Sequence, residues 1–200
     1  MVKRTTSLIN LAGPYAIYGA NVVAQCAKQD VAYADLSGET LFVKDMIAKH
    51  GDTAIKSGSR IIPVCGYEAL PFDLGCMALI MEAGDFLLKL DTSAPRKVMG
   101  KIMERVGPKS GDGPKPERLD LWSYTIEFKA TDDSGNMASA TVTGKGQPSY
   151  KSKADIIGQV GILLATNDER LPNISGILTP ASVLGLGILD DFANARLYFK

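Results

Sequence analysis

Apolar positions follow two alternating periods through the first ninety or so residues. Short apolar runs of strand length are each followed by a segment whose apolar residues recur three and four apart, the spacing of one helix face. This pattern predicts strands at Thr6 to Ala12, Val31 to Leu36 and Arg60 to Cys65, and helices at Ala20 to Lys28, Thr40 to Ala54 and Pro71 to about Leu90. Successive strand-helix units with nearly continuous apolar strands predict an α/β fold with a parallel sheet covered by helices.

The pattern changes in the second half of the chain. Residues 106–120 are rich in Gly, Pro and Lys, which predicts an exposed loop. Alternating residues in Leu121 to Ala130 and Met137 to Val142 then predict an antiparallel hairpin. Helices are predicted at Ser152 to Ala165 and from Pro180, capped by Thr179, toward Phe192. We therefore expect a first domain over residues 1–75 and an α+β second domain over residues 76–200 that contains the loop.

Charge and cysteine content narrow the function. The chain has 22 basic and 22 acidic residues and no long run of one sign, which argues against a nucleic-acid partner. Its three cysteines, Cys26, Cys65 and Cys76, are odd in number and lack metal-type spacing. We interpret them as reduced, buried thiols, expect no metal site, and expect an intracellular, cytoplasmic protein, with a membrane surface or an organelle as the alternatives.

Loops with similar residues follow all three predicted strands of the first half. They read "AGPY" from Ala12, "DLSGE" from Asp35 and "CGYEALPFDLG" from Cys65. Parallel neighbouring strands would bring these loops to one edge of the sheet, where ligands bind. The expected crevice would receive these polar side chains: Tyr15, Asp35, Ser37, Glu39, Tyr67, Glu68 and Asp73. Gly13 and Pro14 would form a rigid backbone shelf, and the helix start after them would offer free N–H groups to an anion.

Four segments, in order, resemble one enzyme family. They are "NLAGPYAIYGANVVAQCAKQDVAYADLSGE", "RIIPVCGYEALPFDLG", "ATVTGKGQPSY" and "GILTPASVLG". The chain thus resembles the saccharopine dehydrogenase-like oxidoreductases, in particular the branch of the trans-acting enoyl reductases. The resemblance implies a Rossmann-like domain that binds NADP or NAD, a second domain that completes the site, and hydride transfer such as enoyl reduction. It places "AGPY" near the nicotinamide end of the cofactor and "DLSGE" after the next strand. With the loop argument, we expect cofactor-binding residues at Ala12, Gly13, Pro14, Tyr15, Asp35 and Gly38 and substrate-binding residues at Glu39 and Tyr67, and the catalytic residues are unassigned.

The chain departs from the family pattern in two places. It has no G-x-G-x-x-G turn between a strand and a helix, the motif that cradles a pyrophosphate, so the N-terminal part of the Rossmann domain is expected to be missing. The stretch between Gly75 and Leu121 is also shorter than its family counterpart. We therefore expect weak or absent cofactor binding by this chain alone. The alternative function is a non-catalytic binding or scaffold protein that keeps the fold.

The partners expected from the sequence are a small-molecule or acyl substrate and a second copy of the chain. The predicted helix after Pro71 is strongly apolar, with Met77, Ile80, Met81 and residues 86–88 as its apolar positions. These residues could face a membrane surface or a lipid, or pack in the core or a subunit interface. An uncovered edge of the parallel sheet would favour a homodimer.

Overall fold

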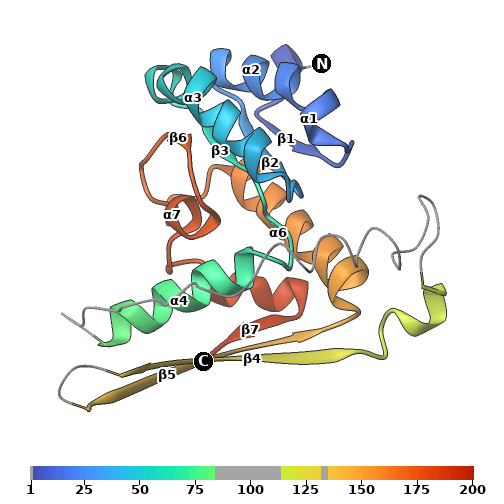
Figure 1. Ribbon diagram of the computed structural model, residues 1–200, viewed down its shortest axis with the longest axis vertical. Coiled ribbons are helices and arrows are strands. Elements are labelled where there is room, and N and C mark those ends of the chain that lie inside the picture. The colour runs from blue at the N-terminus through green and yellow to red at the C-terminus, as the bar shows by residue number, and fades with distance from the viewer. Residues whose placement is uncertain (1, 84–113, 132–134) are drawn as a thin grey trace.

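Two sheets lie one above the other along the long axis of the molecule, with helices on and between them (Figure 1). The computed structural model describes residues 2–83, 114–131 and 135–200. The helices of this part are α1 (Tyr15–Tyr18), α2 (Ala20–Lys28), α3 (Thr40–Ser57), α4 (Leu70–Ala83), α6 (Lys153–Thr166) and α7 (Pro180–Leu184).

The first sheet is parallel, as predicted. Its strands are β1 (Ser7–Asn10), β2 (Ala32–Asp35), β3 (Arg60–Ile62) and β6 (Gly176–Ile177), in the order β1-β2-β3-β6. Ser7 pairs with Ala32, and Tyr33 pairs with Ile61. The fourth strand comes from far along the chain, since Gly176 pairs with Arg60. The α/β fold with a parallel sheet is therefore confirmed, and the second half of the chain contributes one of its strands.

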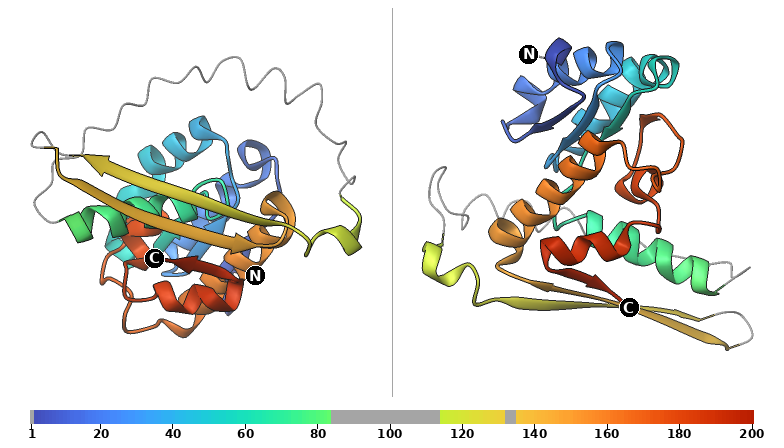
Figure 2. Two further views of the ribbon diagram at one scale, coloured as in Figure 1. Left: turned by 90° about the horizontal axis from the view of Figure 1, so that it is seen from below. Right: turned by 180° about the vertical axis from the view of Figure 1, so that it is seen from behind.

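Alternate residues of the central strands pack into two different hydrophobic cores. Tyr33 and Ile61 point toward α2 and α3, which pack against each other. Their neighbours Ala34 and Ile62 belong to a second core that contains the buried apolar residues of α6. This alternation is the two-residue period of a strand. Because α6 packs on β1 and β2 from the face opposite α2 and α3, helices cover both faces of the sheet (Figure 2).

The second sheet is antiparallel and begins with the predicted hairpin. Its strands are β4 (Ser123–Thr131), β5 (Met137–Lys145) and β7 (Leu197–Phe199), in the order β4-β5-β7. The hairpin pairs Tyr124 with Gly144 and Phe128 with Ala140. Helix α4 lies across this sheet, where Leu79 packs against Ala130 and Ala140. The α+β character of the second half is confirmed.

The last predicted helix is wrong in its length. Thr179 caps α7 as expected, because its hydroxyl accepts a hydrogen bond from the Ser182 N–H at 3.4 Å. The helix ends at Leu184, because Gly185 adopts a left-handed φ of 63°. The chain then forms a separate 3₁₀ helix at Leu189–Ala195, which holds Phe192 in the core. Thr179 and Pro180 therefore determine where α7 begins, and Gly185 determines where it ends.

The apolar helix predicted after Pro71 is only partly described. Met77 packs on the main core and Leu79 is buried, whereas Ile80 and Met81 are exposed. Residues 84–113, which include the apolar positions 86–88 and half of the predicted loop 106–120, lie outside the described residues. Among the helices in the described part of the chain, none has the length and apolar composition needed to cross a bilayer.

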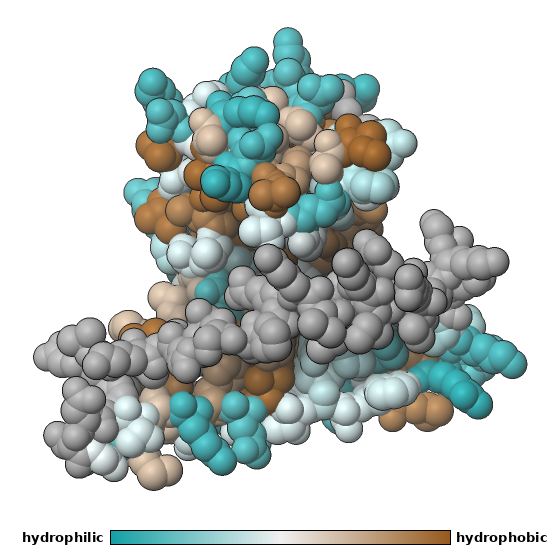
Figure 3. Space-filling view, in the orientation of Figure 1, coloured by the Kyte–Doolittle hydropathy of each residue, from teal (hydrophilic) through white to brown (hydrophobic). Residues whose placement is uncertain are grey.

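Exposed apolar side chains of the upper layer are scattered among polar ones. Figure 3 shows separate hydrophobic residues between hydrophilic neighbours on this face, above the grey segment. Ile17, Leu41 and Ile55 are three such exposed residues from α1 and α3. Singly scattered apolar residues are usual for a protein surface, so this face gives no support to a membrane-binding patch.

Replacing Gly144 with alanine is expected to lower the free energy of unfolding by about 1–3 kcal/mol. The Tyr124 ring lies directly over Gly144, so an added Cβ would stand 2.1 Å from its Cζ atom. The ring would have to move and give up its hydrogen bond to Ser152. Urea unfolding would measure the loss. In the control, Gly51→Ala, the new methyl group meets open space on α3, and stability should rise by about 0.5–1 kcal/mol.

Candidate functional site

The three predicted loops meet at the carboxyl edge of the parallel sheet. The Glu39 carboxylate connects the loop after β2 to Tyr15 and Ala16, which follow β1. The backbone of Cys65, after β3, donates to the Asp35 carbonyl at 2.7 Å. The prediction that these backbone bends lie on one rim is therefore confirmed. We call this edge, formed by residues 10–16, 35–39 and 63–67, the rim.

A buried carboxylate connects two loops of the rim. Asp35 is fully buried, and its Oδ1 accepts hydrogen bonds from the Ser37 N–H at 2.9 Å and the Ser37 hydroxyl at 2.6 Å. The same oxygen accepts the Val64 N–H at 3.0 Å, and Oδ2 accepts the Tyr33 hydroxyl at 2.8 Å. These four donors satisfy the carboxylate inside the protein. Asp35, predicted to bind cofactor, thus shapes the rim from within.

Glu39, predicted to bind substrate, lies just before α3, and its side chain caps the first turn of α1. Its two carboxylate oxygens accept the N–H groups of Tyr15 at 2.7 Å and Ala16 at 2.8 Å. A negative charge at a helix start is favourable there because the first N–H groups have no partner within the helix. The expectation that this helix start offers free N–H groups to an anion is therefore wrong, because the protein's own carboxylate already uses them.

The side chain of Tyr15 also points inward. It is 7% exposed, and its ring centroid lies 6.2 Å from that of Phe42. The hydroxyl donates to the Asn10 carbonyl at 3.1 Å and accepts the Leu36 N–H at 3.3 Å, and burial raises its pKa. The phenol thus braces the loops after β1 and β2 against each other, and only the backbone of this residue lies near the surface of the rim.

The other predicted cofactor residues form the exposed part of the rim. Ala12, Gly13 and Pro14 are exposed together on one loop, and Gly38 is exposed on the next. A Cβ at Gly38 would meet nothing within 4 Å. The residues expected to form a backbone shelf are thus exposed, and their binding of a cofactor stays a prediction.

Tyr67, the other predicted substrate residue, lies where the two sheets approach each other. Its ring packs edge-on against Tyr124 of β4, with 4.7 Å between the ring centroids. Next to it, Glu68 forms an ion pair with Lys153, at the start of α6, with 2.5 Å between Oε1 and Nζ. The turn after β3 is thus fastened to the second sheet by stacking and to α6 by charge. Asp73, also expected in this crevice, instead accepts the Ala181 N–H of α7 at 2.7 Å.

A small cavity of about 340 Å³ opens on the α6 side of the rim. We define it by its lining residues: Ile9, Leu11, Leu36, Ser149, Tyr150, Lys153, Ala154, Ile157 and Gly158. Its walls are apolar, and Lys153 is the one cation among the lining residues. Gly158 leaves the helix surface open, since a Cβ there would meet nothing within 4 Å. The cavity can therefore admit a flat ring against the helix.

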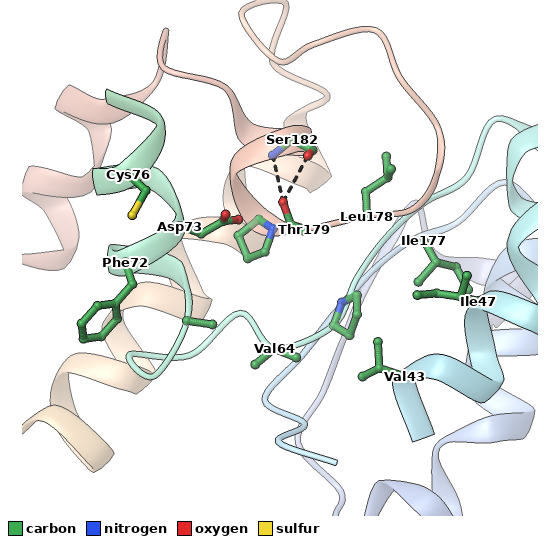
Figure 4. A pocket seen from close by; sticks show the side chains of 13 residues that line it. Val43, Ile47, Val64, Phe72, Asp73, Cys76, Ile177, Leu178, Thr179 and Ser182 are labelled. Carbon is green, nitrogen blue, oxygen red and sulfur yellow. Dashed lines mark hydrogen bonds between the residues drawn. The ribbon is translucent and has the colours of Figure 1, made fainter. Parts of the chain in front are cut away.

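A large cavity of about 830 Å³ opens on the α3 side of the same rim. Figure 4 shows its walls: Val43 and Ile47 from α3, Val64 after β3, Phe72 and Cys76 on α4, and Ile177 to Ser182 leading into α7. The turn after β3 separates the two cavities. Val64 lines the large one, while Gly66 adjoins Leu36 of the small one.

Sequence reasoning missed the residues of α6 and α3 that line these cavities. The predicted helix at Ser152 to Ala165 was interpreted only by its apolar stripe. Lys153 and Gly158 lie on it, and nothing local in the sequence shows that its first turns reach the carboxyl edge of the sheet. The topology supplied the missing signal, because a helix that precedes a parallel strand must cross the sheet.

The cysteines differ from one another in exposure. Cys26 and Cys65 are fully buried, as predicted, whereas Cys76 is only half-buried and lines the large cavity. Burial raises the pKa of the Cys26 thiol to about 11 and also raises that of Cys76. In residues 2–83, 114–131 and 135–200, no group of three His, Cys, Asp or Glu side chains is arranged to hold a metal ion.

Comparison with known proteins identifies the family. A protein of Mycobacterium tuberculosis named "Putative trans-acting enoyl reductase" is 38% identical over 333 aligned residues, which span 98% of this chain and 80% of the relative. The chain belongs to the trans-acting enoyl reductase family. Proteins named trans-acting enoyl reductase from Mycobacterium ulcerans and Mycobacterium leprae are 36% and 39% identical over 42% and 40% of this chain, and 20% and 19% of their own lengths. No family model matches the chain.

The length of the first alignment shows a difference between these trans-acting enoyl reductases. It extends over 333 residues, although this chain has 200. The mycobacterial relative therefore contains a long stretch that has no counterpart here. The branch named in the sequence analysis is confirmed by these relatives, and the wider saccharopine dehydrogenase-like family stays a prediction.

Asp35→Asn is expected to lower the free energy of unfolding by about 1–3 kcal/mol. The amide has one acceptor oxygen for four donors, and the Tyr33 hydroxyl, which already accepts from Asn10, would face a second donor. Urea titration of both proteins measures the difference. Asp52→Asn, on the exposed surface of α3, is the control and should change stability little. Equal stability of the two variants would contradict the role given to Asp35.

Proposed function

We propose that this protein is an NAD(P)-dependent reductase that reduces the carbon–carbon double bond of an enoyl substrate. The names of its relatives support the reaction class, and the exposed backbone of the rim supports a nicotinamide cofactor. A bound reduced nicotinamide would supply the hydride for the β-carbon of the double bond and would itself be oxidised, and a proton from solvent would complete the reduction at the α-carbon. The protein's task is to position the reactants and to exclude water.

The small cavity is the proposed place of the nicotinamide ring, and its form is the observation that carries the proposal. The cavity lies beside Leu11 and Leu36, at the carboxyl ends of two parallel strands, where cofactors bind in open α/β sheets. Gly158 leaves free space on its helical wall, and Ile9 and Ile157 make it apolar. An aromatic ring fits these walls, and a side chain at position 158 would take its place.

Lys153 is the proposed partner of the reacting carbonyl group. It lines the small cavity, and its ion pair with Glu68 holds the ammonium group in place. During reduction of an enoyl group, negative charge develops on the carbonyl oxygen. A fixed ammonium group that donates to this oxygen lowers the barrier, since it stabilises the charge as it forms.

The phosphates of the cofactor find little support on this rim. The Glu39 carboxylate already accepts the N–H groups at the start of α1 and would repel a phosphate there. The sequence also lacks the glycine-rich turn that cradles a pyrophosphate. We therefore propose weak binding, centred on the nicotinamide end, for the chain alone, with NAD or NADP as the cofactor. The same two observations favour the second candidate, a binding or scaffold protein without turnover.

Saturation-transfer difference NMR with millimolar NADPH tests the ring site, because this method detects weak ligands. In the wild-type protein, the nicotinamide protons are expected to receive saturation. Gly158→Met fills the cavity and should reduce their signal to the level without protein. Gly51→Met introduces the same side chain at an open helical glycine on α3, away from both cavities, and should preserve it. A Gly158→Met spectrum identical to the wild type would reject the small cavity as the ring site.

Lys153→Met is expected to lower kcat for NADPH-dependent reduction of crotonyl-coenzyme A by a factor of about 10²–10³, as loss of one donor to a developing oxyanion does. Lys153→Arg should recover part of the rate, because it restores a cationic donor. Lys49→Met removes an exposed lysine that pairs with Asp45 and is the control. Full activity of Lys153→Met would exclude the proposed role, and no turnover by the wild type would favour the scaffold alternative.

A further inference from the structure

The large cavity has the size and the apolar lining of a site for part of the substrate. We infer that it holds the aliphatic chain of the acyl substrate while the reacting end lies across the rim at the small cavity. This inference rests on the proposed function. It assigns a binding role to the space between α3, α4 and α7, which contains none of the rim residues predicted from the sequence to bind cofactor or substrate.

The size and walls of the large cavity suit an apolar ligand. Its volume of about 830 Å³ lies within the range of about 300–1,000 Å³ that is typical of small-molecule sites. Val43, Ile47 and Ile177 form one wall, Phe72 the opposite one, and Leu178 lies on the side between them. A hydrocarbon chain would gain from leaving water for this space in proportion to the apolar area that it buries.

The polar groups of the large cavity are already engaged with the protein. Asp73 Oδ2 accepts the Ala181 N–H at 2.7 Å. The Thr179 hydroxyl accepts the Ser182 N–H at 3.4 Å and lies 3.1 Å from the Ser182 hydroxyl. These bonds stabilise the first turn of α7. Because one Asp73 oxygen and both hydroxyls are used in this way, the cavity offers mainly apolar contacts rather than the several free donors and acceptors that a sugar or nucleotide needs.

The charge of the residues that line the large cavity indicates that its ligand is not the charged part of the cofactor. Asp73 is the one charged residue among those that line it, and no Lys or Arg does. A phosphate placed there would meet a carboxylate without a neutralising cation. The uncharged chain of an acyl substrate therefore fits the large cavity, and the charged parts of a cofactor or carrier do not.

One turn, Pro63 to Gly66, adjoins both cavities. Val64 lines the large cavity, and its N–H donates to Asp35 within the rim. Two residues later, Gly66 adjoins Leu36, which lines the small cavity. Pro63, Cys65 and Gly66 are buried and Val64 is half-buried, so a chain in the large cavity would have to pass along Val64 to reach Lys153. This arrangement places the enoyl group, at the head of the chain, beside the proposed ring site.

Cys76 provides a reporter inside the large cavity. It lines the wall on α4 and is half-buried, whereas Cys26 and Cys65 are fully buried. Small thiol reagents should therefore modify Cys76 first. A ligand that fills the cavity should protect it, and this readout requires neither cofactor nor turnover.

The test follows the rate of Cys76 alkylation by N-ethylmaleimide with intact-protein mass spectrometry. Dodecanoyl-coenzyme A at about ten times its Kd should slow alkylation about tenfold by mass action. Acetyl-coenzyme A at the same concentration, which has the same carrier but no long chain and no free thiol to consume the maleimide, should leave the rate unchanged. Cys76→Ser, which should lose the fast-reacting site, confirms which thiol reacts. Equal protection by both compounds would overturn the inference, because the coenzyme rather than the chain would then be the part that binds. An absence of protection by dodecanoyl-coenzyme A would also overturn it.

A pair of variants on α3 locates the chain. Ile47 lines the large cavity and is 50% exposed, while Ile55 lies two turns later on the same helix, is 59% exposed and does not line it. Ile47→Glu places a charge in the cavity and should raise the Kd obtained from Cys76 protection about tenfold or more, since burying a charge without a partner is costly. Ile55→Glu should leave this Kd unchanged. Equal effects of the two substitutions would overturn the assignment.

The results also separate this inference from the proposed function. Cys76 protection without NADPH contacts in the NMR experiment would support a chain-binding protein and reject the reductase. NADPH contacts without Cys76 protection would retain the reductase and reject the large cavity as the chain site. Both readouts use the full 200-residue chain.

Discussion

The candidate site depends on one buried carboxylate. Asp35 lies at the end of a central strand with four donors around it, two of them backbone N–H groups on different loops. A buried carboxylate is tolerated only where such donors replace water, so the loops after β2 and β3 are held close to it. Tyr15 extends the constraint to the loop after β1 through its bonds to Asn10 and Leu36. These buried polar contacts hold the rim together and thereby position both cavities beside it.

Local periodicity predicted most elements of the fold, because the elements that it found are amphipathic or buried in a simple way. Helix α2 begins and ends at the predicted residues, and the three parallel strands and the hairpin lie where expected. Nonlocal pairing was not predictable. The two-residue strand β6 has no periodicity of its own and exists because Gly176 and Ile177 pair with β3. The break after Leu184 depended on a single left-handed glycine in an otherwise apolar segment.

The sequence predicted where the candidate site lies, but not which of its side chains face a ligand and which bind the protein itself. Parallel topology places loops on one edge, and the sequence identified these loops correctly. Whether Glu39 or Asp35 faces a ligand or the protein depends on which N–H groups lie nearby after folding, and both carboxylates proved to be internal acceptors. The exposed shelf from Ala12 to Pro14 uses backbone alone. Lys153 and the walls of the cavities come from helices that reach the rim only in three dimensions.

The pairing of β3 with β6 also has a consequence for how the chain folds. Arg60 and Gly176 are neighbours in the sheet although most of the second half of the sequence separates them. Strands β1 to β3 can associate early during synthesis on the ribosome, but their last partner, β6, emerges long after them. Contacts over such sequence distances slow folding, because a long loop must close before they form. One border of the parallel sheet thus forms later than the other strands, and with it the wall of the large cavity that Ile177 provides.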